Sequence, residues 1–340
     1  MRFRGHIYKT FKKLICLIML TTTISCAGLE KGKNITQDSI DTNNLKLREW
    51  EPLNNFSDII LKVHGYNDYS NSFDLSGRFF ANNDIKSISF DLNGFGENTN
   101  RGEWFGLDIH IKNLAEIIQN IKRKNPKKNI YLMGESMGGA IATSLVKKHK
   151  ELPIDGVILV APAIWNFTET NFIKSIPLKF MSKVFPKLQL SGKKFIKVRA
   201  SNNNEILKEL SEDKFFIHKP TLESLQGIIT LMDESFIDTK EYLENPTFET
   251  LILLPLRDEI IPRKPIISII SDLNSKKNFL ENIKINIYED SYHMILRDLQ
   301  GEEILNDIKD WIFRNNKKKS YNNNSILKQL KDAIFVHRLD

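Results

Sequence analysis

A glycine-rich hexapeptide, residues 134–139, most limits what this chain can fold into. It reads Gly-Glu-Ser-Met-Gly-Gly, between an apolar run at 129–133 that predicts a buried strand and a run at 140–146 that predicts a helix. In so tight a turn, larger side chains two residues either side of the serine would meet neighbouring backbone. The pattern predicts that Ser136 is an exposed nucleophile and that the amide of Met137 points at whatever it attacks. The alternative interpretation is a glycine-rich turn without chemistry.

A serine alcohol is a poor nucleophile, so the chain should also supply a base for its proton and a carboxylate that orients the base. In sheets with this kind of turn the expected chain order is serine, acid, histidine, each on a loop after a strand. Asp258 and His293 each follow a predicted strand in that order. We predict that Asp258 accepts the Nδ1 hydrogen of His293 and that Nε2 faces the serine. Glu259 and Asp290 are competing candidates for the acid.

The negative oxygen formed by such an attack needs a second amide donor, which comes from the loop after a neighbouring strand. Residues 64–67, His-Gly-Tyr-Asn, follow an apolar run and fit this role. Gly65 permits a sharp turn, and we predict that the amide of Tyr66 points at the same position as that of Met137. His64 is expected to pack and hydrogen-bond this loop rather than to transfer protons.

The body of the chain alternates strand-like apolar runs with helical patterns. One predicted helix, residues 107–124, repeats apolar residues at a period close to 3.6. Buried strands separated by helices predict an α/β fold, with a mostly parallel sheet covered on both faces. The predicted strands are 59–63, 85–90, 129–133, 156–161, 250–255 and 283–288, and the other predicted helices are 73–81, 140–146 and 302–314.

Together these motifs resemble the α/β-hydrolase superfamily. The residues that carry the resemblance are His64, Gly65, Asp91, Gly94, Gly96, Gly134, Ser136, Gly138, Gly139, Asp258 and His293. Over about residues 55–315 the chain is similar to the monoacylglycerol lipase and lysophospholipase branch, also called serine aminopeptidase S33-like hydrolases. The resemblance implies an α/β-hydrolase fold, a triad of Ser136, Asp258 and His293, and oxyanion amides on Tyr66 and Met137.

Between Pro162 and about Asn245 the alternation of strands and helices stops. We predict that a helical cap is inserted here, at about residues 163–245. Its first part, residues 163–197, holds seven lysines and one acid among aromatic and aliphatic residues. This composition suits an anionic lipid surface with an acyl chain beneath, and it equally suits a lid whose lysines are solvated.

The first 26 residues have the pattern of a signal peptide. Five basic residues and no acid accompany an apolar run at 14–24, shorter than the roughly 20 residues that span a bilayer. Residues 23–26, Thr-Ile-Ser-Cys, resemble a bacterial lipobox, in which Cys26 would be lipidated. We expect export to the bacterial cell envelope as a membrane-anchored lipoprotein that faces the periplasm or the exterior. The alternatives are plain secretion, with ordinary signal cleavage after Ala27, and an uncleaved anchor.

Charge and cysteine content bear on nucleic-acid binding, disulfides and cysteine-based metal sites. The net charge of +7 comes from the ends, because residues 1–26 contribute +5 and residues 315–340 contribute +4, which leaves −2 for the body. The basic balance is therefore no evidence for nucleic-acid binding. The two cysteines, Cys16 and Cys26, both lie in the leader, so the body can form no disulfide and no cysteine-based metal site.

The expected organisation is a signal peptide at 1–26, a flexible tether at 27–46, an α/β-hydrolase domain at 47–315 with its cap, and a basic tail at 316–340. The expected activity is hydrolysis of a carboxylic ester through an acyl-enzyme, without metal or organic cofactor. A lysophospholipid or monoacylglycerol is the expected substrate, and the lipid anchor and the basic cap would face a membrane. An acyltransferase, a thioesterase or an S33-type peptidase could use the same triad. The alternative outside enzymes is a non-catalytic envelope protein that binds lipid.

Overall fold

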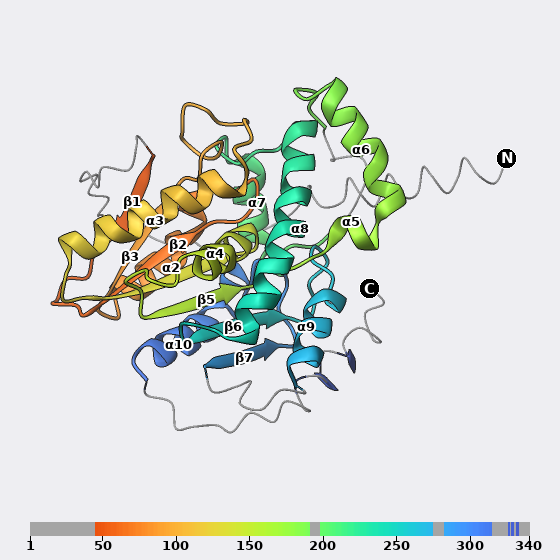
Figure 1. Ribbon diagram of the computed structural model, residues 1–340. Helices are drawn as coiled ribbons and strands as arrows, with labels where there is room; N and C mark the ends of the chain where they lie inside the picture. Colours follow the sequence, from red (N-terminus) through yellow and green to blue (C-terminus); the bar gives the residue numbers. More distant parts are fainter. Residues whose placement is uncertain are drawn as a thin grey trace.

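The structure, a computed structural model, describes residues 45–190, 198–274 and 282–314, together with 326, 328, 329, 331 and 332. The predicted signal peptide lies outside the described residues, as do most of the predicted tether and most of the basic tail. The described part of the chain folds around one central sheet with helices on both faces (Figure 1), which confirms the predicted α/β class.

The central sheet has seven strands in the order β1-β3-β2-β4-β5-β6-β7. Neighbours from β3 to β7 in this order are parallel, whereas β1 runs antiparallel to β3 and pairs Leu47 with Phe90. The six predicted strands are all present, but β1 was not predicted, because Leu-Arg-Glu-Trp is short and half charged. The strands are β1 (Leu47–Trp50), β2 (Asp58–Val63), β3 (Ile85–Phe90), β4 (Asn129–Glu135), β5 (Gly156–Val160), β6 (Thr250–Pro255) and β7 (Ile283–Tyr288).

Helices cover both faces because successive strand residues point to opposite sides. On one face, Leu61 and Leu132 belong to a core that includes α3, α4, α8 and α9. On the other face, Ile60 and Met133 pack with α2 and α10. The helices are α2 (Asp74–Ala81), α3 (Gly106–Lys124), α4 (Met137–Lys148), α5 (Phe167–Thr170), α6 (Phe172–Val184), α7 (Asn204–Glu212), α8 (Leu222–Glu244), α9 (Lys264–Asn274) and α10 (Gly301–Ile312), with 3₁₀ turns η2 (Ser70–Phe73) and η4 (Ile295–Arg297).

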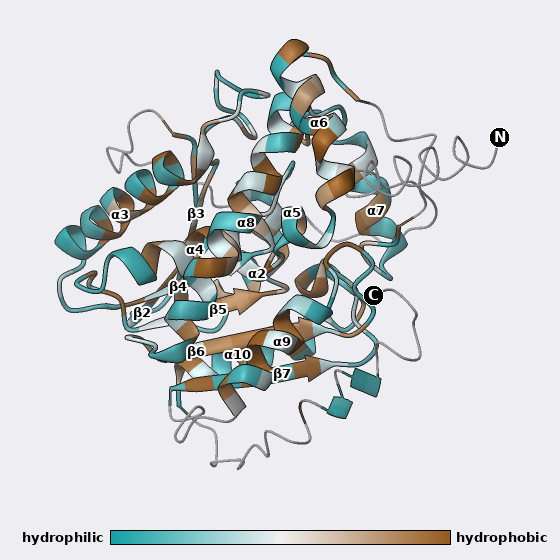
Figure 2. Cartoon of the chain, turned by 45° about the vertical axis from the view of Figure 1, so that its right-hand side comes forward, coloured by the Kyte–Doolittle hydropathy of each residue, from teal (hydrophilic) through white to brown (hydrophobic). Residues whose placement is uncertain are grey.

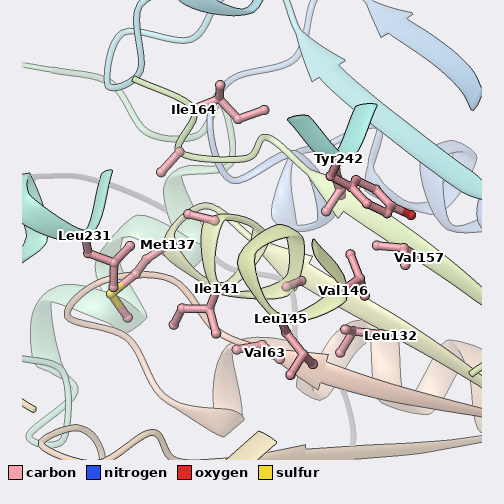
Figure 3. Close-up of a cluster of buried hydrophobic side chains, with 14 of the residues drawn as sticks. Val63, Leu132, Met137, Ile141, Leu145, Val146, Val157, Ile164, Leu231 and Tyr242 are labelled. Atoms are coloured by element: carbon pink, nitrogen blue, oxygen red, sulfur yellow. The ribbon is translucent and has the colours of Figure 1, made fainter. Parts of the chain in front are cut away.

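Helix α4 lies in the middle of the larger core. Its first ten residues are all buried. Figure 3 shows Ile141 of this helix among Val63 and Leu132 from the sheet and Leu231 and Tyr242 from α8. The amino end of α4, which follows the glycine-rich turn directly, is therefore fixed by packing on several sides.

Helices α5 to α8 fill the interval between β5 and β6, and we call residues 163–245 the cap. Helix α8 packs along α4 over much of its length, so it belongs to the core of the body as well as to the cap (Figure 1). The sequence alone did not reveal this double role. Within the described ranges, no helix combines the length and the apolar character needed to cross a bilayer.

Candidate active site

Ser136 occupies a strained turn between β4 and α4. Its φ of 54° is positive, which is uncommon for a residue other than glycine. A β-carbon at Gly134 would lie 2.3 Å from the carbonyl oxygen of Gly138, and one at Gly138 would lie 2.1 Å from that of Val63. Glycine is therefore required at both predicted positions, and the turn places Ser136 just beyond the carboxyl end of β4.

Ser136, His293 and Asp258 form one hydrogen-bonded chain at this edge of the sheet. Nε2 of His293 lies 2.9 Å from Oγ of Ser136, and Nδ1 lies 2.7 Å from Oδ2 of Asp258. When Nδ1 donates its hydrogen to the carboxylate, Nε2 is left to accept the hydrogen of the serine hydroxyl. The structure thus brings together the three residues that the sequence predicts as a triad.

The Asp258 carboxylate is fixed by its own loop. Oδ1 accepts hydrogen bonds from the amides of Ile260 and Ile261 at 2.7 and 2.9 Å. The other oxygen, Oδ2, therefore stays directed at His293.

The two competing acids make contacts elsewhere. Glu259 accepts a hydrogen bond from the amide of Arg199 at 2.9 Å, and Asp290 forms an ion pair with Arg257. Among the three carboxylates considered from the sequence, Asp258 is the one that contacts the histidine.

Burial and charge act in opposite directions on His293, which is 5% exposed. Burial alone would lower its pKa, but the charge of Asp258 and the hydrogen bond to it, with a smaller contribution from Glu135, raise the pKa above the ordinary 6.5. The imidazolium form is thereby stabilised, as expected for a base that must take a proton from serine.

The loop after β2 lies directly against the nucleophile. A β-carbon at Gly65 would be 3.2 Å from Cβ of Ser136 and 3.8 Å from its Oγ. Tyr66 and Met137 both line the pocket over Ser136. Because Met137 is the first residue of α4, its amide has no partner within the helix. The backbone at these two positions can supply the pair of oxyanion donors that the sequence predicts.

His64 links this loop to the next glycine turn. The ring is fully buried, with Nδ1 2.8 Å from the carbonyl oxygen of Gly65 and Nε2 accepting the amide of Leu92 at 2.9 Å. One nitrogen donates and the other accepts, so the ring is neutral, and burial lowers its pKa. His64 therefore stabilises the loop and does not reach the reacting atoms through either nitrogen.

A pocket opens over Ser136, and its interior and mouth together enclose about 750 Å³. Apolar side chains from the cap, from the first residue of α4 and from the loops after β6 and β7 make most of its wall. They include Met137, Ala163, Val198, Phe216, Ile228, Met232, Ile260, Ile261 and Met294. This mostly apolar lining is typical of a site for a small, largely apolar ligand.

A buried ion cluster beside the triad was not predicted. Nη2 of Arg297 lies 2.7 Å from Oδ2 of Asp68 and 3.8 Å from Oε2 of Glu135, and all three residues are at most 8% exposed. The sequence did hold a signal, because Glu135 adjoins Ser136 and Arg297 follows His293 by four residues.

The predicted lipidation site, Cys26, lies outside the described residues.

A serine, a histidine and an aspartate in this geometry, on this sheet, define an α/β hydrolase with a serine nucleophile. A family model described as serine aminopeptidase, S33, matches residues 55–300, which is more than half of the chain. The chain belongs to this family. The predicted branch of the superfamily is thereby confirmed.

Related proteins cover the same part of the chain. This chain is 21% identical over 252 residues to phospholipase YtpA of Bacillus subtilis (strain 168), and the aligned region covers 72% of this chain and 91% of that protein. It is 22% identical over 278 residues to the monoglyceride lipase of Mus musculus, which spans 80% of this chain and 88% of that protein.

Solved structures show the same fold. A monoacylglycerol lipase of Paleococcus ferrophilus superposes with a TM-score of 0.64 and 19% identity, covering 79% of this chain and 98% of that one. A soluble variant of the monoglyceride lipase of Saccharomyces cerevisiae, in complex with a substrate analog, superposes with a TM-score of 0.69 and 17% identity, covering 86% and 100%.

Proposed function

We propose that this protein hydrolyses carboxylic esters of single-chain lipids, such as a monoacylglycerol or a lysophospholipid. The observation that carries the proposal is the hydrogen-bonded chain from Ser136 through His293 to Asp258 beneath an apolar pocket. The triad suits attack on an ester carbonyl, and the pocket suits an acyl chain. The monoglyceride lipase and the phospholipase among the relatives support this substrate class.

The reaction proceeds in two halves. Oγ of Ser136 attacks the carbonyl carbon while Nε2 of His293 takes its hydrogen, and Asp258 stabilises the imidazolium. The amides of Tyr66 and Met137 donate to the oxyanion. The bond to the alcohol then breaks, and the alcohol leaves with the proton from His293. A water molecule, deprotonated by the same nitrogen, releases the fatty acid and restores the serine.

The charges in the pocket favour an ester over an aminoacyl amide. An aminopeptidase must bind the ammonium group of its substrate with a free carboxylate. Of the described residues, Asp68 and Glu135 place carboxylates at the pocket, and both lie close to Arg297, at 2.7 and 3.8 Å. Their charge is therefore already compensated in part.

A fluorophosphonate probe and a p-nitrophenyl octanoate assay test this proposal. Ser136→Ala should lose probe labelling and about 10⁶-fold in kcat, as loss of a triad nucleophile does in other serine hydrolases. Ser144→Ala removes another buried serine hydroxyl, from α4, and should keep both. Titration of released fatty acid separates hydrolysis from acyl transfer. Equal turnover by Ser136→Ala and wild type would refute the triad.

We further propose that the outer face of α6 contacts an anionic lipid surface. Ile173, Ile176, Phe180 and Val184 recur at helical spacing and are 82, 52, 67 and 49% exposed. Figure 2 shows α6 at the edge of the molecule, with hydrophobic residues along it. Large exposed apolar patches of this kind mark interaction sites.

The charge beside this face supports an anionic partner. Exposed Lys179, Lys183 and Lys187 follow one another at four-residue spacing, next to the apolar residues. Of the other four lysines of the predicted basic stretch, Lys174 belongs to α6, and Lys193, Lys194 and Lys197 lie outside the described residues. An apolar face flanked by lysines is typical of helices that bind anionic lipid.

Flotation with phosphatidylglycerol vesicles tests this contact. Phe180→Asp should lower the bound fraction, whereas Ile237→Asp, which alters a similarly exposed apolar residue of α8, should leave it unchanged. If both variants lost the same bound fraction, or if neither lost any, the role of α6 would be refuted.

We also propose that the protein is exported and anchored through lipid on Cys26. The basic leader, the short apolar run and the lipobox-like residues 23–26 support this. Growth with an alkyne analogue of palmitate should label the protein, and Cys26→Ser should abolish the label. Cys16→Ser, the matched control, should retain it. A label that survives Cys26→Ser would exclude this anchor.

A further inference from the structure

The side chain of Tyr66 joins the loop after β2 to the cap. Its hydroxyl lies 2.9 Å from Oγ of Ser224, a buried residue in the first turn of α8. Its ring packs edge-on against Phe95 and Trp104, with centroids 5.9 and 6.3 Å apart. Both the ring and the hydroxyl are fixed, so the position of α8 contributes to the direction of the backbone at Tyr66.

A second cap segment holds the same loop. The amide of Ile217 donates to the carbonyl oxygen of Asn67 at 2.9 Å, and the hydroxyl of Tyr69 donates to Asp213 at 2.7 Å. Asn67 has a φ of 67°, a left-handed conformation that is uncommon outside glycine and needs support from its surroundings. The cap therefore contributes to holding a strained loop.

Helix α8 also forms part of the acyl pocket. Ile228 and Met232 line the pocket one and two turns after Ser224. Trp104 lies against the helix at Gly227, where a β-carbon would be 2.2 Å from the indole. The helix that would contact a bound acyl chain is thus the helix that holds Tyr66.

We propose that Ser224 is a positioning residue, which acts through the Tyr66 hydroxyl to aim the Tyr66 amide at the oxyanion. This inference rests on the proposed function, in which that amide is an oxyanion donor. An amide that is poorly aimed stabilises the transition state less but affects substrate binding little. The link between Tyr66 and Ser224 therefore acts on kcat rather than on KM.

Two conservative substitutions and their combination test the link. Tyr66→Phe and Ser224→Ala should each lower kcat for p-nitrophenyl octanoate by about tenfold, less than the roughly 10²–10³-fold loss that follows removal of an oxyanion donor. KM should change by less than about twofold, because the donor acts mainly in the transition state. The double variant should be no slower than either single variant, since both remove the same contact. Ser224→Thr keeps a hydroxyl and should restore turnover.

Matched controls separate this link from general loss of stability. Tyr242→Phe removes a buried tyrosine hydrogen bond at the far end of α8, and Thr230→Ala removes an exposed hydroxyl from the same helix. Both should keep wild-type kcat.

Three outcomes would overturn the inference while the enzyme remains active. The first is an unchanged kcat in Tyr66→Phe and Ser224→Ala. The second is a fall in kcat in the double variant that equals the product of the two single falls. The third is a rise in KM with kcat unchanged. A wild-type protein that neither labels with the fluorophosphonate nor cleaves the ester would instead overturn the proposed function, and this inference with it.

Discussion

Nη2 of Arg297 and Oδ2 of Asp68 lie 2.7 Å apart, although the two residues are 229 positions apart in the chain. The contact joins the turn η4, which follows His293, to the loop after β2. Glu135, next to the nucleophile, lies 3.8 Å from the same guanidinium nitrogen. The loops that carry Ser136, His293 and the Tyr66 amide thus share one buried ion cluster.

Arg297→Met should destabilise the fold by about 3–5 kcal/mol, because it leaves Asp68 and Glu135 as buried charges without their partner. Urea unfolding followed by circular dichroism measures this loss. Arg314→Met is the matched control, since Arg314 is 69% exposed and lies 3.7 Å from Glu249, and it should change stability by less than about 1 kcal/mol. Similar small effects of both substitutions would show that the cluster does not stabilise the fold.

Lys62 is a second buried ionisable group, on β2 beneath α2. It is fully buried, with Nζ 3.2 Å from Oγ of Ser76 and 4.4 Å from the centre of the Trp50 ring. Burial lowers its pKa well below 10.5, opposed by the charge of Asp74. In the folded protein the charged form is therefore disfavoured.

Lys62→Met should stabilise the protein at neutral pH, by about 1–2 kcal/mol if it follows other replacements of buried charges by apolar residues. Between the lowered pKa and 10.5 the unfolded chain binds more protons, so wild-type stability rises with pH there. The advantage of the variant should therefore shrink as the pH approaches 10.5. Urea unfolding at a series of pH values measures it, with exposed Lys150→Met as control. An advantage independent of pH would contradict the lowered pKa.

Local patterns predicted the six parallel strands. They also made Ser136, Asp258 and His293 candidates for one site, because each lies in a turn or loop that follows a strand. The sequence favoured Asp258 as the acid but kept the adjacent Glu259 as a competitor, and the fold shows that Asp258 is the one that faces the histidine. Contacts between distant residues were also beyond sequence patterns. Tyr66 and Ser224 are 158 positions apart, and nothing local marks either as the partner of the other.

Asp258→Asn should lower kcat by about 10⁴-fold, because an amide at this position favours the wrong histidine tautomer. Glu259→Gln should leave kcat nearly unchanged, since the Glu259 side chain contacts the amide of Arg199 rather than His293. Asp290→Asn serves as a second control, and steady-state kinetics on one ester measures all three. A larger loss in Glu259→Gln than in Asp258→Asn would assign the acid to Glu259.

Specificity should rise with acyl length until the pocket is full. Each buried methylene contributes about 0.8 kcal/mol, so about six carbons could raise kcat/KM by on the order of a thousandfold if their burial is expressed in the transition state. A p-nitrophenyl series from acetyl to palmitoyl, below aggregation concentrations, measures this. Met232→Trp, which adds volume to the pocket wall, should move the optimum to shorter chains. A profile that peaks at acetyl would instead favour a small-ester hydrolase.

The pH dependence of kcat/KM should report the raised pKa of His293. The base must be neutral to take the proton of Ser136, so activity rises as the pH passes through that pKa, above the ordinary 6.5. Asp258→Asn removes the charge that raises the pKa, so the remaining activity should rise at a lower pH than in wild type. Glu259→Gln should leave the profile unshifted. Two results would show that Asp258 does not stabilise the imidazolium. One is a wild-type activity that rises with an apparent pKa at or below 6.5, and the other is an apparent pKa that Asp258→Asn does not change.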